Sequence, residues 1–366
     1  MEKCRVFFIS NGNGIPVDIT PSTSFHDVFS VINEQLMLTH SINEYVVLTP
    51  KVHEFDDSKI IDFVGDFKDM EFHVVEKSEH EIIQHFLDTT YPSVKFASFS
   101  YSAIAISLLS KLNYMHLLAN AAANPDDLPI ILSMIPYDSF ENAHGTELLE
   151  AVLKWFSKDF FKRFTIPKCS HCGTDMSEDS PKAPTKSERL NGAYSVSRFL
   201  CNKCGAHNRF VRYHSVPTLL EKCVGESTEF VVAFAAIINS LGFPFRIVSL
   251  LSKDYFWLEA WCDDQNRYVH IDPYEGCIDL PFNKKFEQAR WFVGVGPYEC
   301  ADITYKYVPD YHQVYNERSR TMNNEIFKSL IEFRGQMWGS MSQPDSVAVA
   351  DRLKCDYEYH QKKIAK

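Results

Sequence analysis

The sequence predicts an α+β protein built from more than one domain. Three observations lead to this class. Strand patterns and an amphipathic helix alternate within residues 1–77, helical patterns dominate residues 82–165, and two Cys-x-x-Cys pairs precede alternating strands after residue 210. The length of 366 residues accommodates two or three domains of about 100–200 residues each.

The first 77 residues show the order strand, turn, strand, helix, strand. RVFFIS indicates a strand, NGNG a turn, and IPVDIT a second strand in which Ile15, Val17 and Ile19 share one face. SFHDVFSVINEQL has helical spacing, and EYVVL and EFHVVE supply further strands. This order is typical of a ubiquitin-like β-grasp domain, which we expect to span residues 1–77. Another small α+β domain is the alternative.

A helix is expected to begin after residue 77, which would mark a domain boundary. Ser78 and Glu81 form the S-x-x-E pattern of a capping box. Helical patterns then continue to residue 165. The last of them, TELLEAVLKWFSKDFFKRF, is expected to be one helix that carries its large apolar side chains on one side: Leu149, Leu153, Phe156, Phe160 and Phe164.

Four cysteines in two Cys-x-x-Cys pairs follow this helix: Cys169, Cys172, Cys201 and Cys204. A tight turn brings two thiolates to one side, and two such turns complete a tetrahedral zinc site. The 28 residues between the pairs (173–200) include the polar stretch SEDSPKAPTKSE, which we expect to be a protruding loop. Two unrelated or redox-active pairs are the alternative. Four thiolates leave no coordination position open, so this Zn²⁺ would be structural.

Charge argues against general nucleic-acid binding. The chain has 48 acidic against 37 basic residues, a formal net charge of -11. An acidic chain repels phosphate backbones unless it carries a local basic patch, and the sequence shows no dense one. The composition, 45% hydrophobic and 23% charged, is that of a globular protein.

Neither a signal peptide nor a membrane span is expected. MEKCRVFF lacks the apolar core and the cleavage site of a signal peptide. The longest uncharged apolar stretch, Phe230–Phe245, is shorter than the roughly 20 residues of a spanning helix, so we expect a buried helix there. Ten cysteines without an export signal favour a reducing compartment and metal-bound cysteine pairs.

The segment after the second cysteine pair has the pattern of a catalytic core. Gly225 and Ser227 precede the apolar run Phe230–Ile238. A nucleophile at the N-terminus of a buried helix gains from the helix dipole. DYFWLEAWCDDQNRYVHIDP then predicts two strands, the second with His270 and Asp272 on one face.

From about residue 127 to residue 325 the chain resembles the cytoplasmic peptide:N-glycanase family, which has a transglutaminase-like (papain-like) fold. The stretches that carry the resemblance occur in the family's order: SMIPYDSF, VLKWFSKDFFKRF, PKCSHCG, CNKCG, RYHSVPTLLEKCVGESTEF, LGFPFR, DYFWLEAW, RYVHIDPYEG and ADITYKYV. The two cysteine pairs directly upstream of Ser227 are its most specific feature. The resemblance implies the following parts: a helical start of the core (78–165), a zinc-binding subdomain (166–210), the transglutaminase-like core (211–325) and a C-terminal helical segment (326–366).

The family cleaves the bond between an N-glycan and asparagine with a Cys–His–Asp triad. Its G-R-C-G-E-W motif aligns with residues 225–230, so Ser227 occupies the cysteine position. Its D-H-V-W motif aligns with residues 254–257, so Tyr255 occupies the histidine position, while Asp272 is retained. A serine hydroxyl needs a base to become a nucleophile. Tyr255 cannot be that base near neutral pH, because a phenol has a reference pKa near 10.

We therefore expect a catalytically inactive homologue that acts as a binding or scaffold protein in the handling of misfolded N-glycoproteins. Cys223 and His270 are the nearest substitutes for the lost groups, but neither aligns with a catalytic position. The resemblance implies a misfolded glycoprotein or N-glycan in the cleft, and proteasome-shuttle or ubiquitin-pathway proteins as partners. It also implies the cytoplasm, with the nucleus as a second compartment. Two alternatives stay open: an active amidase with a rearranged triad, and a DNA-repair-type transglutaminase-like scaffold, which the acidic charge disfavours.

Overall fold

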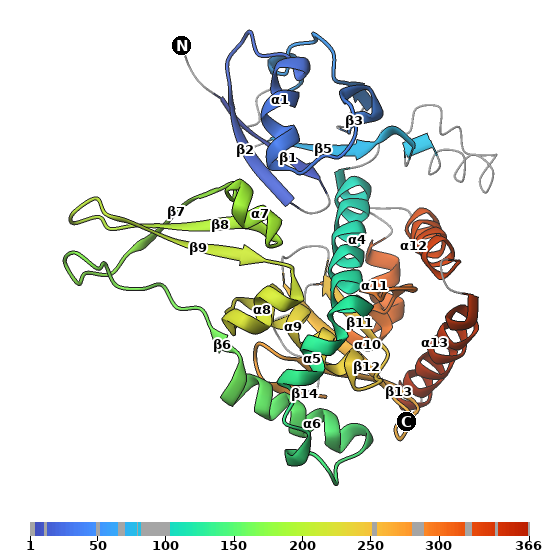
Figure 1. Ribbon diagram of the computed structural model, residues 1–366. Helices are drawn as coiled ribbons and strands as arrows, with labels where there is room; N and C mark the ends of the chain where they lie inside the picture. Colours follow the sequence, from blue (N-terminus) through green and yellow to red (C-terminus); the bar gives the residue numbers. More distant parts are fainter. Residues whose placement is uncertain are drawn as a thin grey trace. The chain divides into compact units, whose positions relative to one another are not determined.

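The computed structural model of the chain describes residues 4–10, 13–48, 52–64, 70–78, 80–81, 103–250, 255–279, 289–318, 324–340 and 343–364. They belong to two compact units, residues 1–114 and 115–366, and each is described by itself (Figure 1). Both units mix helices and strands, which confirms the α+β class. A helix was expected to begin after residue 77; residues 77–78 and 80–81 are helical, and its continuation lies outside the described residues. The finer domain boundaries stay predictions.

The first unit contains a five-stranded sheet in the order β2-β1-β5-β3-β4. Its strands are β1 (Cys4–Ser10), β2 (Asn13–Ile19), β3 (Tyr45–Leu48), β4 (Val52–Glu54) and β5 (Met70–Glu76). β1 and β5 are parallel, and the other neighbours are antiparallel. Helix α1 (Phe25–Gln35), a 3₁₀ turn (Ile42–Glu44) and the short helix α2 (Ile61–Val64) complete the unit.

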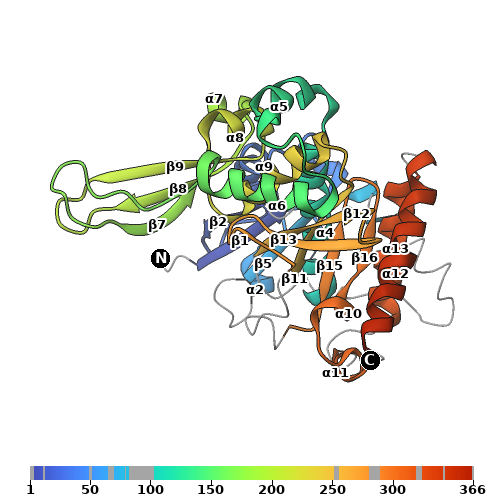
Figure 2. The same cartoon turned by 90° about the horizontal axis from the view of Figure 1, so that it is seen from below.

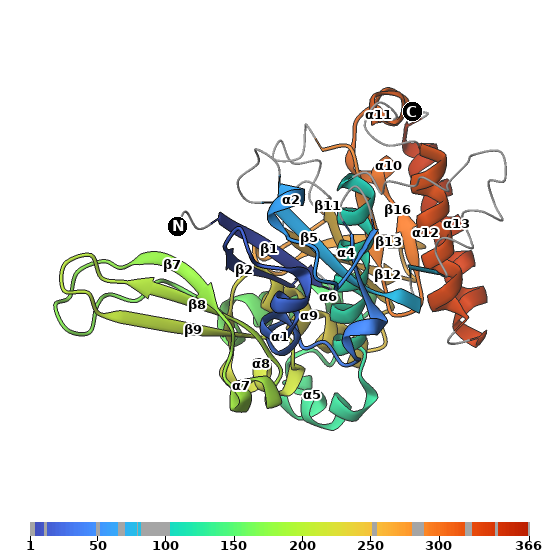
Figure 3. The same cartoon turned by 90° about the horizontal axis from the view of Figure 1, so that it is seen from above.

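Helix α1 covers one face of this sheet (Figure 3). It begins at a capping box, because Ser24 Oγ accepts the N–H of Asp27 and the Asp27 carboxylate accepts the N–H of Ser24. The period-2 alternation of the strands turns Phe8 and Phe72 toward the helix, where the ring of Phe25 meets Phe72 edge-on at 5.6 Å. These three rings are fully buried and form the centre of the core.

The second unit is built on a six-stranded antiparallel sheet in the order β14-β13-β12-β11-β15-β16. Its strands are β11 (Phe245–Leu250), β12 (Phe256–Cys262), β13 (Arg267–Asp272), β14 (Cys277–Ile278), β15 (Phe292–Val295) and β16 (Cys300–Asp302). Every residue of β11, β12 and β15 is buried. Burial on both faces explains why these strands are apolar runs without clean alternation.

Helices cover this sheet. Their bounds are α4 (Ala103–Ala122), which contributes residues to both units, α5 (Leu128–Met134), α6 (Gly145–Trp155), α8 (Val216–Lys222), α9 (Ser227–Ser240), α10 (Thr304–Tyr307), α11 (Tyr311–Arg318), α12 (Asn324–Gly339) and α13 (Gln343–Ile364), with 3₁₀ turns at Pro125–Asp127 and Tyr137–Ser139. The central helix is α9, which packs on β11 and β12 and against α5 and α8. It is buried throughout Thr228–Ile238, as its apolar sequence predicts. Among the described residues, no helix combines the length and apolar character that crossing a membrane requires.

A three-stranded arm projects from the core of this unit in both Figure 1 and Figure 2. It consists of β7 (Ser177–Lys182), β8 (Ala193–Leu200) and β9 (His207–Tyr213), with β8 in the middle. The stretch SEDSPKAPTKSE was expected to be a loop, and this prediction is wrong. β7 pairs with β8, and a capping box at Thr185 starts the short helix α7 (Lys186–Leu190). Pairing with the next strand makes this polar segment extended.

The single long helix expected before the first cysteine pair is also wrong in its last part. Helix α6 ends at Trp155, and a π-helical turn follows over Phe156–Phe160. The chain then extends into β6 (Lys162–Arg163), which pairs in parallel with β10 (Val224–Gly225). Phe164 therefore leaves the helix and lies in a different cluster, because pairing with β10 replaces the helical hydrogen bonds.

Candidate functional site

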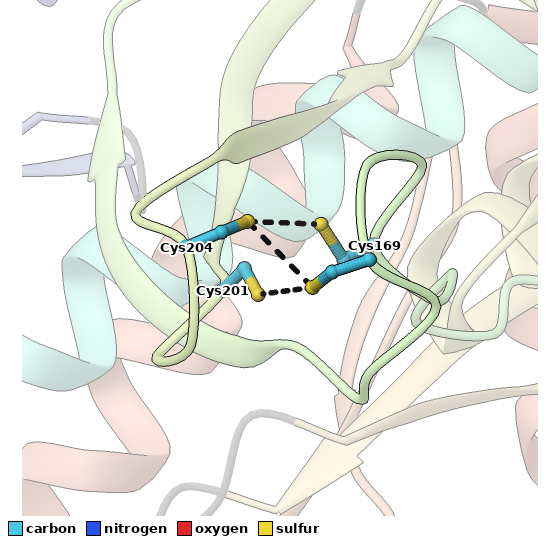
Figure 4. Close-up of side chains that lie close together, drawn as sticks. Cys169, Cys201 and Cys204 are labelled. Atoms are coloured by element: carbon cyan, nitrogen blue, oxygen red, sulfur yellow. Dashed lines mark hydrogen bonds between the residues drawn. The ribbon is translucent and has the colours of Figure 1, made fainter.

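The four cysteines of the two Cys-x-x-Cys pairs lie together, as the sequence predicts (Figure 4). Cys169 and Cys172 lie in the turn after β6, and Cys201 and Cys204 lie in the turn that joins β8 to β9. All four sulfur atoms lie within 4.8 Å of one another. The Sγ···Sγ distance is 3.5 Å for Cys169–Cys204, 3.5 Å for Cys172–Cys201 and 3.7 Å for Cys172–Cys204.

The two turns have the same local geometry. Gly173 and Gly205 each follow a second cysteine, and they have φ values of 69° and 72°. Each glycine N–H donates to the carbonyl of the first cysteine of its turn, at 2.8 Å and 2.9 Å. A residue with a side chain would be strained at this φ, so glycine allows the turn to close around both thiols.

The donor set fits a tetrahedral metal ion. Zinc–thiolate bonds of about 2.3 Å give sulfur–sulfur separations of roughly 3.7 Å in a tetrahedron. Disulfides are excluded in this structure, because all four thiols are free. The Thr174 hydroxyl lies 3.0 Å from Cys172 Sγ and 3.2 Å from Cys201 Sγ, and these contacts hold the pKa of both thiols below the usual value. The cluster could therefore bind a metal ion.

Apolar side chains surround this cysteine cluster. Phe199, Met176 and Phe210 pack around Cys169 and Cys201. Phe164 completes the group, since its ring stacks on Phe210 at 3.9 Å and lies 5.5 Å from the ring of Phe199. The cysteine cluster thus has a small apolar core of its own, and Phe164, which was expected to lie in a helix, is part of it.

Ser227 is the first residue of α9. The preceding helix, α8, ends at Lys222 and is capped by Cys223, which has a left-handed φ of 50°. The chain then forms β10 beside β6, and Glu226 caps α9. The side chain of Glu226 accepts the N–H of Glu229, and Glu229 Oε2 accepts the N–H of Glu226 at 3.0 Å. The predicted start of the buried helix is confirmed.

Two carboxylates flank Ser227, and one arginine binds both. Arg212, on β9, donates from Nη1 to Glu226 Oε2 and from Nη2 to Glu229 Oε2, each at 2.6 Å, while its Nε donates to Glu229 Oε1. Tyr194 Oη also donates to Glu229 Oε1 at 3.1 Å. Burial raises the pKa of Glu226, and the charge of Arg212 opposes this shift. We refer to these residues as the Arg212 clamp.

Tyr255 and Asp272 are brought together. Tyr255 Oη donates to Asp272 Oδ2 at 2.5 Å, and Asp272 Oδ1 accepts the N–H of Glu275 at 3.0 Å. Burial raises the pKa of Tyr255 well above its usual value, and the hydrogen bond to Asp272 adds to this shift. The phenol is therefore protonated near neutral pH.

The start of α9 lies close to the residues that follow Asp272. The rings of Phe230 and Tyr274 meet edge-on at 5.2 Å, and the guanidinium of Arg163, on β6, lies 4.3 Å from the centre of the Tyr274 ring. Ser227 is thus at the same end of the unit as Asp272. Among the described residues, however, no hydrogen bond joins Ser227 to Tyr255 or Asp272.

The two residues considered as substitutes have other partners. His270 Nδ1 lies 3.1 Å from Tyr307 Oη, and burial lowers the pKa of His270. Tyr307 Oη in turn donates to Glu259 Oε1 at 2.6 Å, so the phenol oxygen is left to accept from the histidine. The Cys223 thiol donates to the carbonyl of Leu220 at 2.8 Å, and burial raises its pKa. These contacts indicate a structural role for His270 and for Cys223.

The Arg212 clamp was not predicted from the sequence. Glu226 and Glu229 have the spacing of a helix-capping pair directly before an apolar run, and this signal could have been read. Arg212 itself carries no local signal, since it lies on another strand.

Parts of this core are similar to transglutaminase-like domains. Residues 180–273, which include Ser227, Tyr255 and Asp272, match the transglutaminase-like superfamily. Residues 248–341 match the Rad4 transglutaminase-like domain.

Curated relatives agree with the resemblance seen in the sequence. The chain is similar to the peptide-N(4)-(N-acetyl-beta-glucosaminyl)asparagine amidases of Caenorhabditis briggsae (31% identity over 212 residues; 56% of this chain, 35% of the relative) and Saccharomyces cerevisiae (32% over 206 residues; 53% and 54%). The Mus musculus enzyme is 28% identical over 210 residues (56% and 32%). This chain therefore spans between about a third and about a half of the length of these relatives.

Among solved structures, a crystal structure of Rad4-Rad23 crosslinked to an undamaged DNA aligns with a TM-score of 0.44 and 12% identity, over 78% of this chain and 60% of that chain. This similarity is too low to assign a shared fold.

Proposed function

We propose that this chain is a peptide:N-glycanase homologue that binds misfolded N-glycoproteins and does not cleave them. The observation that carries the proposal is the hydrogen bond from Tyr255 Oη to Asp272 Oδ2. In a Cys–His–Asp triad the aspartate orients an imidazole, and this imidazole takes the thiol proton and later protonates the leaving nitrogen. Here the aspartate holds a phenol that already carries its proton.

Each group at this site lacks what cleavage requires. Ser227 occupies the cysteine position, and a serine hydroxyl needs a base to attack an amide carbonyl. Tyr255 keeps its proton, because it donates a hydrogen bond to Asp272 and its pKa is raised, so it cannot accept a proton from Ser227. The imidazole of His270 is hydrogen-bonded to Tyr307 and not to Ser227. General acid–base catalysis contributes roughly 10²–10⁴-fold, and that factor would be lost.

Groups suited to ligand binding remain at this end of the unit. The rings of Tyr255 and Tyr274 are partly exposed, and the exposed carboxylate of Glu275 pairs with Arg163 at 3.4 Å. Arg163 covers part of the Tyr274 ring. Sugar rings stack their apolar faces on aromatic side chains, while their hydroxyls bond to carboxylates. These residues support a glycan, or the glycosylated segment of an unfolded protein, as the ligand.

Zinc is the metal that we propose for the four cysteines. It would supply folding free energy by tying the turn after β6 to the β8–β9 turn, and it would take no part in chemistry because four thiolates fill its coordination sphere. Elemental analysis of the purified chain is expected to give one zinc per chain. A metal-free, stably folded chain would contradict this assignment.

The first unit is proposed to contain a ubiquitin-like β-grasp domain over residues 1–77. The strand order β2-β1-β5-β3-β4, with β1 and β5 parallel and α1 across one face, supports this assignment. Such a domain would bind proteasome-shuttle or ubiquitin-pathway proteins, and the whole chain would act in the cytoplasm, or also in the nucleus. Cooperative unfolding of the isolated residues 1–77 tests the assignment of this domain.

Release of free glycan from a denatured glycoprotein tests the central proposal. We expect no release by the natural chain or by Ser227→Cys, since the proton shuttle is still missing. Ser227→Cys combined with Tyr255→His rebuilds the aligned triad beside Asp272, and we expect this variant to recover some activity.

Binding and cleavage are separated by a second measurement. The natural chain is expected to bind a denatured glycoprotein more tightly than the same protein stripped of its glycans. Glycan release by the natural chain that Ser227→Ala abolishes would refute the proposal and establish an active amidase with a rearranged triad. Release that depends on Cys223 would show that the nucleophile is a different residue.

A second candidate function is a scaffold in DNA repair. It is favoured by the match of residues 248–341 to the Rad4 transglutaminase-like domain. The net charge of -11 opposes it, since binding to DNA requires contacts with phosphates. Titration with duplex DNA at several salt concentrations distinguishes the two functions. Binding to DNA with an affinity that falls steeply as the salt concentration rises would favour the DNA-repair scaffold.

A further inference from the structure

Two strands, β6 and β9, contact the residues around Ser227, and each strand lies next to one of the two cysteine turns. We refer to residues 224–229 as the Ser227 segment. On one side it pairs with β6, and the chain after β6 leads into the turn of Cys169 and Cys172. On the other side it is bound by the side chain of Arg212 from β9, the strand that begins just after Cys204.

The first connection is Phe164. Its N–H donates to the carbonyl of Gly225 at 2.8 Å, which fixes the backbone of the Ser227 segment. Its ring stacks on Phe210 at 3.9 Å, in the apolar cluster that contains Cys169 and Cys201. One residue therefore belongs both to the core of the metal site and to the pairing that holds Gly225.

The second connection is the Arg212 clamp. Its guanidinium binds Glu226 and Glu229, which flank Ser227, and its side chain is only 14% exposed. Gly225 fits closely into this arrangement, because a Cβ there would lie 2.4 Å from the Cβ of Glu229. β9 carries both Arg212 and Phe210, so one strand takes part in both connections.

We infer that the metal at the four cysteines sets the position of the Ser227 segment, and that Phe164 and Arg212 are the positioning residues that transmit its effect. Without a shared ligand the two cysteine turns are no longer tied together, and β6 and β9 lose their common support. The Ser227 segment should then loosen locally. The strands β11 and β12 of the six-stranded sheet, in which every residue is buried, should keep their structure. The inference does not depend on whether the site cleaves or only binds its ligand.

Hydrogen–deuterium exchange on the full-length chain tests this inference. Peptides covering the Ser227 segment and β12 are followed before and after the metal is removed with a chelator, and metal release is measured by elemental analysis. We expect exchange in the Ser227 segment to accelerate about tenfold, the factor that the loss of roughly one hydrogen bond represents. Exchange in β12 should stay unchanged.

Variants separate positioning from general stability. Phe164→Ala should still bind one metal per chain, yet its Ser227 segment should exchange as fast as that of the metal-free natural chain. Arg212→Lys should have a similar effect, because lysine cannot bind two carboxylates with a planar fork. Arg209→Lys is the matched control: Arg209 lies on the same strand and pairs with Glu188 at the surface, so exchange should not change.

Three outcomes would overturn the inference. The first is an unchanged Ser227 segment after verified metal removal. The second is equal acceleration in β12, which would mean that the metal supports the whole unit without specific coupling. The third is an equal effect of Arg209→Lys and Arg212→Lys. If Phe164→Ala does not fold, Phe164→Leu, which keeps the volume but loses the stacked ring, replaces it.

Discussion

Replacing Asp356 with asparagine should lower the free energy of unfolding of the second unit by about 3–5 kcal/mol. Asp356 projects from α13 and is fully buried. Its Oδ1 accepts from the N–H of Tyr268 at 3.0 Å and from Lys306 Nζ at 3.2 Å. Its Oδ2 accepts from Arg246 Nη2 and from Tyr305 Oη, each at 3.1 Å. One carboxylate thus satisfies four donors on the sheet and on α10.

The magnitude follows from the acceptor oxygen and the negative charge that asparagine lacks. One oxygen becomes an NH₂ group, so two of the four donors lose their acceptor and face another donor. Arg246 and Lys306 are buried cations, and they would keep only Glu259 as a bonded carboxylate, at 2.5 Å and 2.9 Å. Hydrogen bonds to charged groups are worth about 1.5–3 kcal/mol each. Removing one member of a buried ionic network costs about 3–5 kcal/mol, because the remaining charge is uncompensated.

Tryptophan fluorescence during denaturation by urea measures this loss selectively. All five tryptophans of the chain lie beyond residue 114, so the signal reports the second unit. Asp351→Asn is the matched control, since Asp351 is exposed on the same helix and its replacement should change stability by less than about 0.5 kcal/mol. A loss below about 1 kcal/mol for Asp356→Asn, or equal losses in the two variants, would refute the reasoning.

Three further predictions concern the residues around the candidate site. Tyr255→Phe removes the donor to the buried carboxylate of Asp272 and should cost about 1.5–3 kcal/mol in the same denaturation experiment; unchanged stability would show that Asp272 finds another donor. His214 has its pKa lowered to about 3 by burial and by the charge of Arg212, so it stays neutral in the folded chain while the unfolded chain takes up a proton below a pH of about 6.5. Stability should therefore rise with pH between about 3 and 6.5, by up to about 1.4 kcal/mol per pH unit from this group, and His214→Gln should flatten this dependence. Gly225→Ala places a Cβ 2.4 Å from the Cβ of Glu229 on α9 and should lower the free energy of unfolding by about 1–3 kcal/mol. An unchanged free energy of unfolding would mean that the start of α9 can shift to make room for the methyl group.

Features encoded within a few consecutive residues were predicted correctly. Each cysteine turn is closed by its own glycine and its own backbone hydrogen bond, so the spacing Cys-x-x-Cys suffices to predict it. The apolar run Phe230–Ile238 has no polar face, and a helix without a polar face must be buried. The two strands β12 and β13 follow from their apolar runs and from the short turn between them.

The site was predicted in part. The position of Asp272 on its strand was correct, and its partner Tyr255 was named from the alignment of a motif. That Tyr255 donates a hydrogen bond to Asp272 was not evident, because this contact depends on how two strands bring the side chains together. The absence of any hydrogen bond from Ser227 to this pair, among the described residues, likewise required the three-dimensional arrangement.

The sequence by itself determined the four-cysteine cluster, the buried helix and the acidic character of the chain, since each depends on neighbouring residues or on composition. Only the tertiary structure decided the fate of Phe164, the extended state of β7, the Arg212 clamp and the burial of Asp356. In each case the deciding partner lies outside the segment itself: β7 pairs with the next strand, β8, whereas β6 pairs with β10 and α13 packs on β13 across long stretches of chain. Local propensity is worth less than about 1 kcal/mol per residue, so a strand pairing or a buried charge network formed across the fold overrides it.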